Sequence, residues 1–439
     1  MGFNGGVSMF QFNKVRPVQY VVLGFLLVIL VGSILLALPI THLEGVDVQY
    51  IDALFTATSA VSVTGLIAID TADHFNVFGR FIIAILIQIG GLGVTSIGAA
   101  FILISQRKFG LRQRILLKEG LNVDSLGGVV RLVKSVLKMT LIIELVGFIL
   151  SFIVFSRDYP IWSALGISAF HSVAAFNNAG FDILGNLQNL IPYRDSFLLN
   201  VTTAGLIIAG GFGFVTISEI IKKRQYKKFS MNTKIVLLMT ISLLVIGTLL
   251  LKMTEGISWM DAFFFSTSAR TAGFSTISVG NFSQTGLLIL MILMFIGASP
   301  GSTGGGIKTT TFFAILMSIK GISTNTPVTA FKRRIPAESL VKAFSIFILA
   351  ISVICLNTFL VLVVQPELQF LDVLFEVVSA IGTVGLSVGI TPDLNVLSKL
   401  IICLTMFIGR LGTLTIASVW AYRMAATTFN YPEERITIG

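Results

Sequence analysis

Four short segments of this sequence end in a glycine at matching positions, and their backbone could coordinate ions. Segments 52–65 and 372–385 share Asp, Leu-Phe, Ser-Ala and Gly-Leu in register. Segment 261–273 is one residue shorter between its aspartate and its glycine, and segment 168–180 shares this shorter spacing. Each segment is too short to cross a bilayer and too apolar for an exposed loop. We therefore expect four re-entrant half-helices, each followed by a glycine-containing turn.

Such turns present backbone carbonyl groups. Carbonyls beyond the end of a half-helix lack helical partners, and at membrane depth such backbone is tolerated where it lines a watery cavity. Glycine permits the backbone angles that aim successive carbonyls at one axis, and the half-helix C-termini direct their negative ends toward the same site. A ring of these oxygens would replace the hydration shell of a weakly hydrated monovalent cation. The expected ring consists of Val63, Thr64, Gly65, Asn177, Asn178, Ala179, Gly180, Thr271, Ala272, Gly273, Thr383, Val384 and Gly385.

A glycine-rich interruption lies in the sixth apolar run, at 297–309. Pro300 and the nearby glycines cannot sustain a helix, so we expect the run to break near mid-membrane. A phosphate-binding loop is disfavoured because Ile307 separates Gly306 from Lys308 and no strand-forming run precedes it. Two interpretations remain, a flexible gate below the carbonyl ring and a kink that packs against its neighbours. The gate would consist of Pro300, Gly301, Ser302, Thr303, Gly304, Gly305, Gly306, Lys308 and Arg410.

Three basic residues are expected at membrane depth. Arg410 lies near the centre of the last apolar run, where insertion of a charge costs about 2.5 to 3.5 kcal/mol. It could raise a barrier to ions or donate hydrogen bonds to the gate carbonyls, and a structural ion pair is the alternative. Lys308 is expected to extend toward the cytoplasm. Arg270 is predicted to brace the back of the ring against a carboxylate such as Glu376.

The composition places these segments in a lipid bilayer. The chain has 439 residues, of which 54% are hydrophobic and 12% charged, about half the charged share of a soluble domain. A soluble enzyme, a disordered chain and a disulfide scaffold are therefore excluded. Both cysteines lie in apolar runs and are expected to pack there. The three histidines are far apart and match no metal or nucleophile motif, so we expect no enzymatic activity.

Apolar runs long enough to cross the membrane pair up around the four short segments. This pattern predicts an all-α membrane protein with eight transmembrane helices, arranged as four span, pore half-helix, span repeats in pseudo-fourfold order around one pore. The predicted repeats are 1–110, 111–228, 229–334 and 335–439. The runs are 18–38, 79–104, 135–156, 197–221, 235–252, 286–317, 342–364 and 397–422.

Charge alternates between the connections of these runs. Basic clusters at 107–138, 222–234 and 320–342 alternate with acidic connections that include Asp52 and Asp182. The positive-inside rule places the basic loops and both termini in the cytoplasm. The net charge of +10 is explained by this topology, and no nucleic acid partner is expected. The acidic connections would concentrate cations at the outer mouth.

The four glycines and the interruption at 298–308 resemble the Trk/Ktr/HKT superfamily of potassium transporters, most closely its bacterial KtrB-type membrane subunits. Thr383-Val384-Gly385 also matches the start of the potassium-channel filter sequence. The resemblance implies a homodimer in the cell membrane, an intramembrane gating loop and a cytoplasmic ring of KtrA-like nucleotide-binding subunits. In this family serine at the first filter glycine accompanies sodium selectivity in some plant members, so Gly65 favours potassium.

Potassium uptake is thus the expected function, with K+ in the filter and no covalent cofactor. Coupled movement of Na+ with K+ is the alternative, and a receptor or scaffold that transports nothing is a third class. A receptor would tolerate serine at Gly65 or Gly385 and would conduct no ions.

Overall fold

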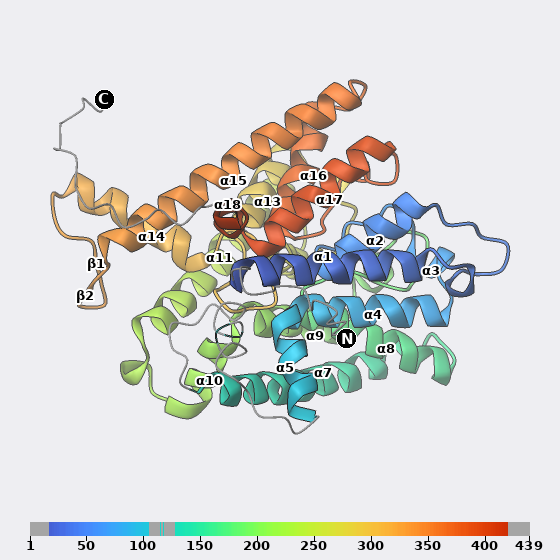
Figure 1. Ribbon diagram of the computed structural model, residues 1–439, viewed down its shortest axis with the longest axis horizontal. Helices are drawn as coiled ribbons and strands as arrows, with labels where there is room; N and C mark the ends of the chain where they lie inside the picture. The colour runs from blue at the N-terminus through green and yellow to red at the C-terminus, as the bar shows by residue number, and fades with distance from the viewer. Residues whose placement is uncertain (1–16, 105–114, 116, 118–127, 420–439) are drawn as a thin grey trace, which may run out of the picture.

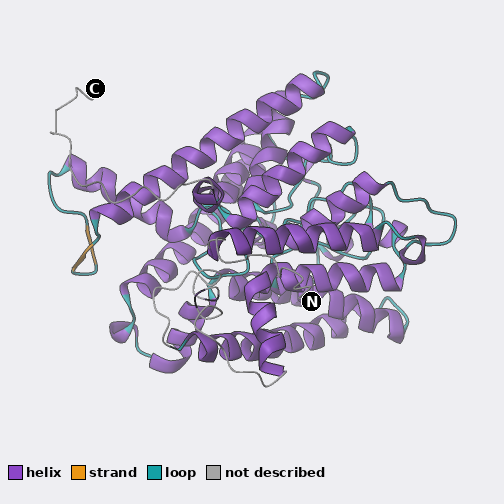
Figure 2. Cartoon of the chain, in the orientation of Figure 1, coloured by secondary structure: helices purple, strands orange, loops and turns teal. Residues whose placement is uncertain are grey.

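The computed structural model describes residues 17–104, 115, 117 and 128–419. The predicted cytoplasmic termini lie outside these residues. So does the predicted repeat boundary at 110, with most of the basic connection around it. Apart from one two-stranded hairpin, the described residues form helices and connecting loops (Figure 2).

Four helices are long and apolar enough by length and composition to cross a membrane, among the residues described, and Figure 1 labels each of them. A fifth crossing results if the bent pair α9–α10 counts as one span. Eight crossings therefore remain a prediction. The four long helices are α1 (Pro17–Leu36), α7 (Val129–Phe155), α11 (Met231–Glu255) and α15 (Ala337–Val364).

A shorter helix follows each long one and packs against it, as the half-helix prediction requires. Three of the four begin after an extended residue, and the C-terminal residues of all four are buried. Ser258 starts one of them as an N-cap, since its hydroxyl accepts the Asp261 N–H at 3.0 Å. The four short helices are α2 (Tyr50–Ser62), α8 (Ile161–Phe176), α12 (Trp259–Ser268) and α16 (Phe370–Gly382).

The next apolar run is broken in all four repeats, whereas the sequence predicted a break only in the third. Runs 79–104, 197–221 and 397–422 are interrupted at Gly93, Gly213 and Gly412. These glycines have φ values of 83°, 84° and 88°, which lie outside the helical region and disfavour other residues. The halves are α4 (Val77–Leu92) and α5 (Val94–Ile104), α9 (Phe197–Gly211) and α10 (Phe214–Lys223), α13 (Gln284–Phe295) and α14 (Thr309–Ser323), and α17 (Val396–Leu411) and α18 (Thr413–Val419).

Small elements complete the described chain. The antiparallel strands β1 (Thr329–Ala330) and β2 (Arg333–Arg334) form a hairpin that projects from the helices at the left of Figure 1. The remaining elements are the short helix α3 (Thr71–His74) and single-turn 3-10 helices at Pro39–Thr41, Ile191–Tyr193, Tyr226–Lys228 and Val279–Asn281.

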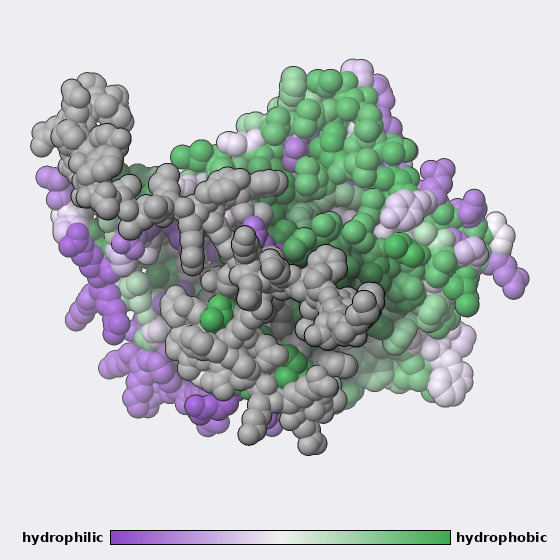
Figure 3. Space-filling model, in the orientation of Figure 1, coloured by the Kyte–Doolittle hydropathy of each residue, from purple (hydrophilic) through white to green (hydrophobic). Residues whose placement is uncertain are grey.

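The surface has the pattern of a multi-pass membrane protein. Hydrophobic residues cover the upper right of Figure 3, over α15, α17 and the right-hand part of α1, and hydrophilic residues gather at the left and right margins. Large apolar side chains on the long helices are exposed, such as Leu27 at 62% and Leu141 at 68%. Exposure of this extent over contiguous helices indicates contact with lipid or another apolar partner.

The buried core has two halves that exchange aromatic residues. One cluster is drawn mainly from residues 25–214 and the other from residues 235–406. Phe55 of α2 packs in the second cluster, and Phe264 and Phe274 pack in the first. The short helices therefore interlock the halves at the centre of the molecule.

Ion pairs also join repeats that are distant in the sequence. Lys399 of α17 donates to Asp52 of α2 at 2.7 Å, and both side chains are about nine-tenths buried. Arg194 pairs with Asp261 of α12 at 2.8 Å, but Arg194 is much more exposed. The Lys399–Asp52 pair links the last repeat to the first, so it closes the arrangement in space.

We predict that Asp52→Asn lowers the free energy of unfolding by about 3 kcal/mol, because it leaves the Lys399 ammonium buried without a counter-charge. Thermal unfolding in detergent tests this expectation. Lys223→Met removes the exposed partner of Glu219 and should change stability by less than about 1 kcal/mol. Equal effects of the two substitutions would contradict a structural role for the buried pair.

Candidate functional site: four glycine turns and the loop beneath them

The four short helices end in turns of the same unusual conformation. A non-glycine residue with positive φ lies two positions before each glycine that the sequence singled out. Such φ values are costly for side chains with a Cβ and persist where the surrounding structure imposes them. The four residues are Val63, Asn178, Thr271 and Thr383, at φ values of 55°, 59°, 82° and 49°.

The four glycines contact one another in cyclic order. A Cβ on Gly65 would lie 2.9 Å from the Gly180 Cα, and one on Gly180 would lie 3.1 Å from the Gly273 Cα. A Cβ on Gly273 would in turn lie 3.1 Å from the Gly385 Cα, and one on Gly385 would lie 2.9 Å from the Gly65 Cα. Their own φ values lie between 66° and 92°. Both the conformation and the close approach therefore require glycine at all four positions.

Each turn is anchored to its own helix by hydrogen bonds from backbone N–H groups. Thr64 and Val384 donate to the Ser59 and Ser379 carbonyls at 2.9 Å, and Ala179 donates to Ala174 at 2.8 Å. Within the described residues, no loop or side-chain donor reaches the carbonyl oxygens of the predicted ring except at Gly180. There Asn189 Nδ2 donates at 3.2 Å. These buried carbonyls are free to accept another partner, such as a cation.

Glycines of the broken helices bring those helices against the turns. Gly90 of α4, Gly210 of α9 and Gly409 of α17 lie against the Val61, Phe176 and Ile381 carbonyls. Each of these carbonyls belongs to the residue four positions before a turn glycine. The same pattern explains the position of Arg410. It directly follows Gly409, where the first two repeats have Gly91 and Gly211.

The loop between α13 and α14 packs against the inner ends of the turns. Gly305 N donates to Thr383 Oγ1 at 3.0 Å, and Thr303 Oγ1 donates to the Phe176 carbonyl at 3.2 Å. The loop also reaches the second broken helix, since Phe214 N donates to the Gly301 carbonyl at 2.9 Å. The predicted gate residues and the predicted ring are thus brought together, although they are distant in the sequence.

Two basic side chains hold this loop by its carbonyl groups. Arg410 Nη1 donates to the Thr303 carbonyl, and its Nη2 donates to Gly90 and, at 3.1 Å, to Gly91. Lys308 Nζ turns back and donates to Gly304 at 2.8 Å and Gly305 at 3.2 Å. Lys308 therefore bonds within its own loop, where these carbonyls offer a half-buried ammonium the hydrogen bonds it needs, and its predicted extension toward the cytoplasm stays a prediction.

The predicted pairing of Arg270 with Glu376 was wrong. Arg270 Nη1 donates to the Thr240 carbonyl of α11 at 3.5 Å. Glu376 instead accepts from Val388 N at 3.2 Å and from two hydroxyls, Ser387 and Thr391. Arg270 lies just beyond the C-terminus of α12, where the helix dipole favours a cation.

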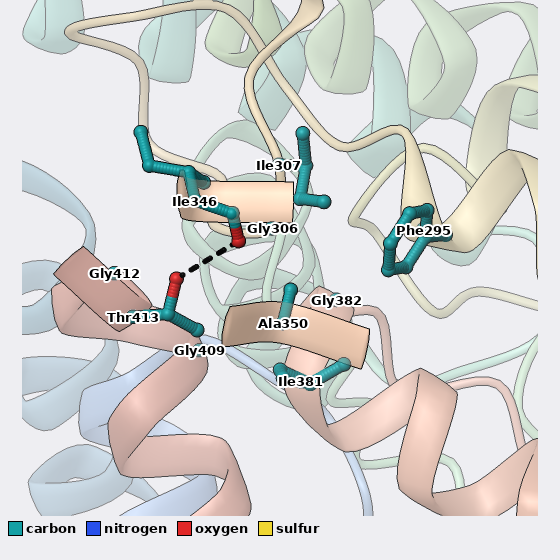
Figure 4. Close-up of a pocket in the computed structure, with 10 residues that line it drawn as sticks. All are labelled: Phe295, Gly306, Ile307, Ile346, Ala350, Ile381, Gly382, Gly409, Gly412 and Thr413. Carbon is teal, nitrogen blue, oxygen red and sulfur yellow. Dashed lines mark hydrogen bonds between the residues drawn. The ribbon is translucent and has the colours of Figure 1, made fainter. Parts of the chain in front are cut away.

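A small cavity lies beside the loop. Its volume is about 30 Å³, and its lining comes from the loop, α13, α15, α16, and α17 with the following break. Figure 4 shows the Ile346 carbonyl accepting a hydrogen bond from Thr413 Oγ1 at one side, at 3.4 Å. Gly306, Gly382, Gly409 and Gly412 form part of the wall. The absence of side chains there leaves space next to Gly306.

Several carboxylates of the acidic connections are engaged in the structure. Asp70 Oδ1 caps α3 by accepting the Ala72 N–H at 2.7 Å, and Asp73 accepts from Asn186 N at 2.9 Å. Burial raises the pKa of Asp182 to about 7; the Leu184 N–H lowers it, and the nearby charge of Asp70 raises it. Asp182 therefore carries less negative charge near neutral pH than its place in the acidic connections suggests.

The sequence analysis missed two polar residues at the back of the second turn. Glu144 of α7 and Gln88 of α4 both accept from Asn177 Nδ2, at 3.2 and 2.8 Å. Glu144 is the only carboxylate in run 135–156. A carboxylate in the middle of a membrane span is a signal of function, so the type and position of Glu144 could have singled it out.

Comparison with known proteins agrees with this architecture. The family model for the TrkH cation transport proteins matches residues 11–251 and 231–428. The chain belongs to this family. It is 38% identical to the potassium/sodium uptake protein NtpJ of Enterococcus hirae, with 97% of this chain and 98% of that protein covered. It is 36% identical to the Ktr system potassium uptake protein B of Bacillus subtilis, covering 98% and 99%.

The fold of this family member resembles that of a solved structure. The crystal structure of the potassium transporter TrkH from Vibrio parahaemolyticus matches with a TM-score of 0.74, covering 94% of this chain and 86% of that one. The two sequences are 17% identical in this alignment. The match therefore supports the helical fold, and the resemblance to the Trk/Ktr/HKT superfamily is confirmed by the family model and by the Ktr relatives.

We predict that Gly210→Ala destabilises the protein by about 1 to 3 kcal/mol, because a Cβ would press on the Phe176 carbonyl and lie 2.7 Å from Thr303 Oγ1. Gly205→Ala on the same helix is the matched control, since a Cβ there meets no atom within 4 Å. Melting temperatures in detergent should fall for the first variant and stay level or rise for the second. Equal melting temperatures would contradict the close packing of α9.

Proposed function

We propose that this protein takes up potassium by conducting K+ through a selectivity filter formed by the four glycine turns. The filter carbonyls are those of residues 63–65, 177–180, 271–273 and 383–385. The cyclic contact of the four turn glycines, with buried carbonyls that lack protein donors, is the observation that carries the proposal. Backbone oxygens in a ring replace the hydration of a monovalent cation at low cost when the turns hold them in place.

In this proposal the loop 298–308 is the gate. The loop lies against Thr383 and Phe176, where it would obstruct ions leaving the filter. Arg410 and Lys308 stabilise this closed arrangement through the loop carbonyls, and their positive charges add an electrostatic barrier. Opening requires that these hydrogen bonds break, so a regulator that opens the gate must favour the open state over the closed state by enough to offset their loss.

The remaining features of the proposal follow the family and the charge pattern. Eight crossings in four quasi-equivalent repeats surround one pseudo-fourfold pore, with both termini in the cytoplasm of a cell-membrane protein. Two copies form a homodimer, and a cytoplasmic ring of nucleotide-binding subunits controls the loop. The Ktr system names of several relatives support a multi-subunit assembly. The protein acts without enzymatic chemistry or a covalent cofactor.

A second candidate is symport of Na+ with K+. The relative from Enterococcus hirae is named a potassium/sodium uptake protein, which favours a role for sodium. A channel moves K+ down its electrochemical gradient, worth about 2.3 kcal/mol per charge per 100 mV. A symporter would instead move K+ against that gradient with a fixed ratio of sodium. Paired isotope fluxes in sealed vesicles distinguish the two.

We predict that deletion of 301–306 increases rubidium uptake by vesicles that contain the protein, because it removes the loop segment beneath the filter. Uptake should exceed that of the full-length protein at the same protein amount. Ser323→Ala is the control, since its hydroxyl bonds only the Lys320 carbonyl on the same helix. Unchanged uptake by a folded deletion variant would contradict the gate.

We predict that Gly65→Ser lowers selectivity for K+ over Na+, since the added side chain presses on the Ala179 carbonyl and Gly180 of the neighbouring turn. Reversal potentials in mixed K+ and Na+ should shift toward the sodium value. Gly45→Ser is the control, because Gly45 also has positive φ but a Cβ there meets nothing within 4 Å. A folded Gly65→Ser variant with wild-type selectivity would argue against the filter assignment.

A further inference from the structure

The four turns differ in what supports them from behind. The residue three positions before each turn glycine is Ser62, Asn177, Arg270 or Gly382. Within the described chain, the Ser62 hydroxyl has no hydrogen-bond partner, and Arg270 reaches a backbone carbonyl. Asn177 differs because its side chain bonds to side chains on two other helices.

The Asn177 amide joins three helices. It is fully buried, and the two protons of its Nδ2 are shared among three acceptors: Gln88 Oε1 of α4 at 2.8 Å, Glu144 Oε1 of α7 at 3.2 Å and the Val173 carbonyl of α8 at 2.9 Å. Ser172 Oγ also donates to the Glu144 carbonyl at 2.6 Å. The second turn is thereby fixed both to its own repeat and to the first.

Glu144 occupies a position where an apolar residue would be easier to insert. A carboxylate near the centre of a membrane helix costs about 2.5 to 3.5 kcal/mol. The third repeat shows the apolar alternative. Gly147 of α7 and Gly247 of α11 correspond, because each packs against a serine of the short helix that follows. Glu144 and Leu244 each lie three residues before that glycine, so Leu244 stands where Glu144 does. Glu144 is thus present in the repeat whose turn carries the Asn177 amide, and it accepts from that amide.

The same group of residues reaches the loop. A Cβ on Gly91 would lie 2.6 Å from the Asn177 Cγ, so the Asn177 side chain packs directly on the end of α4. The carbonyls of Gly90 and Gly91 accept from Arg410, which also holds Thr303. The polar contacts therefore continue from Glu144 through Asn177 and α4 to the loop beneath the turns.

We infer that Glu144 and Gln88 are positioning residues for ion selectivity: they hold the Asn177 amide and so keep the carbonyls of 177–180 in register with the other three turns. The inference rests on the proposed function. Loss of either acceptor leaves the buried Nδ2 with fewer partners and allows the second turn to shift. A turn that can shift accommodates the smaller Na+ ion as well as K+.

The test uses the full chain in liposomes, with reversal potentials in mixed K+ and Na+. Glu144→Leu should lower the K+/Na+ permeability ratio by about five- to tenfold, the equivalent of one buried hydrogen bond. Glu144→Gln should restore the ratio to within about twofold of the original protein, because its amide oxygen also accepts. Thr248→Val, which removes a hydroxyl that bonds only its own helix, should leave the ratio unchanged.

Gln88→Leu provides a second measurement if Glu144→Leu fails to fold, and it should lower the ratio in the same direction. If a leucine variant folds and keeps the K+/Na+ permeability ratio of the unmodified protein, the inference is overturned. A Glu144→Gln variant as unselective as Glu144→Leu would overturn it too. A parent protein that carries no potassium-selective current would instead overturn the proposed function, and the inference with it.

Discussion

The structure depends on the close approach of backbone to backbone at glycine. The four turn glycines lie so near one another that no Cβ fits between them, and the glycines of α4, α9 and α17 lie against carbonyls at the ends of the short helices. A side chain at any of these positions would push two elements apart and move a whole turn. The distance between neighbouring turns is therefore set by the absence of side chains at these positions.

A second constraint is that buried polar groups must be satisfied without water. The helix breaks leave backbone carbonyls free, and basic side chains supply the donors that they lack. Arg410 takes the position held by glycine in the first two repeats and joins the last repeat to α4 and the loop. Lys308 serves the carbonyls of its own loop. Charges that would be costly in lipid are thereby stabilised by the irregular backbone around them.

The repeats are alike in backbone and different in side chains. The similar turns carry a hydroxyl, an amide, a guanidinium or no side chain at the position three residues before the glycine. The loop with Pro300 occurs in one repeat, and Arg410 in another. A single chain can differentiate similar segments in this way, whereas identical subunits cannot.

Much of this was determined by the sequence alone. The apolar composition, the four short segments and the positions of Gly65, Gly180, Gly273 and Gly385 follow from repetition and periodicity, which are local properties of the chain. The break before Lys308 was predicted because proline and clustered glycines exclude a helix. The breaks at Gly93, Gly213 and Gly412 were not predicted, because glycine without a proline is tolerated in most membrane helices, although Gly93 and Gly213 each follow a pair of glycines.

The tertiary structure decided which groups meet. The partners of Lys308, Arg270 and Glu376 lie on other elements or on backbone carbonyls, and the sequence carries no signal that distinguishes these partners from nearby charges. The grouping of Glu144, Gln88 and Asn177 likewise arises only when three helices come together. Sequence patterns determine what each segment can form, but hydrogen bonds between distant segments depend on distances of a few tenths of an ångström, which the packing of the whole chain sets.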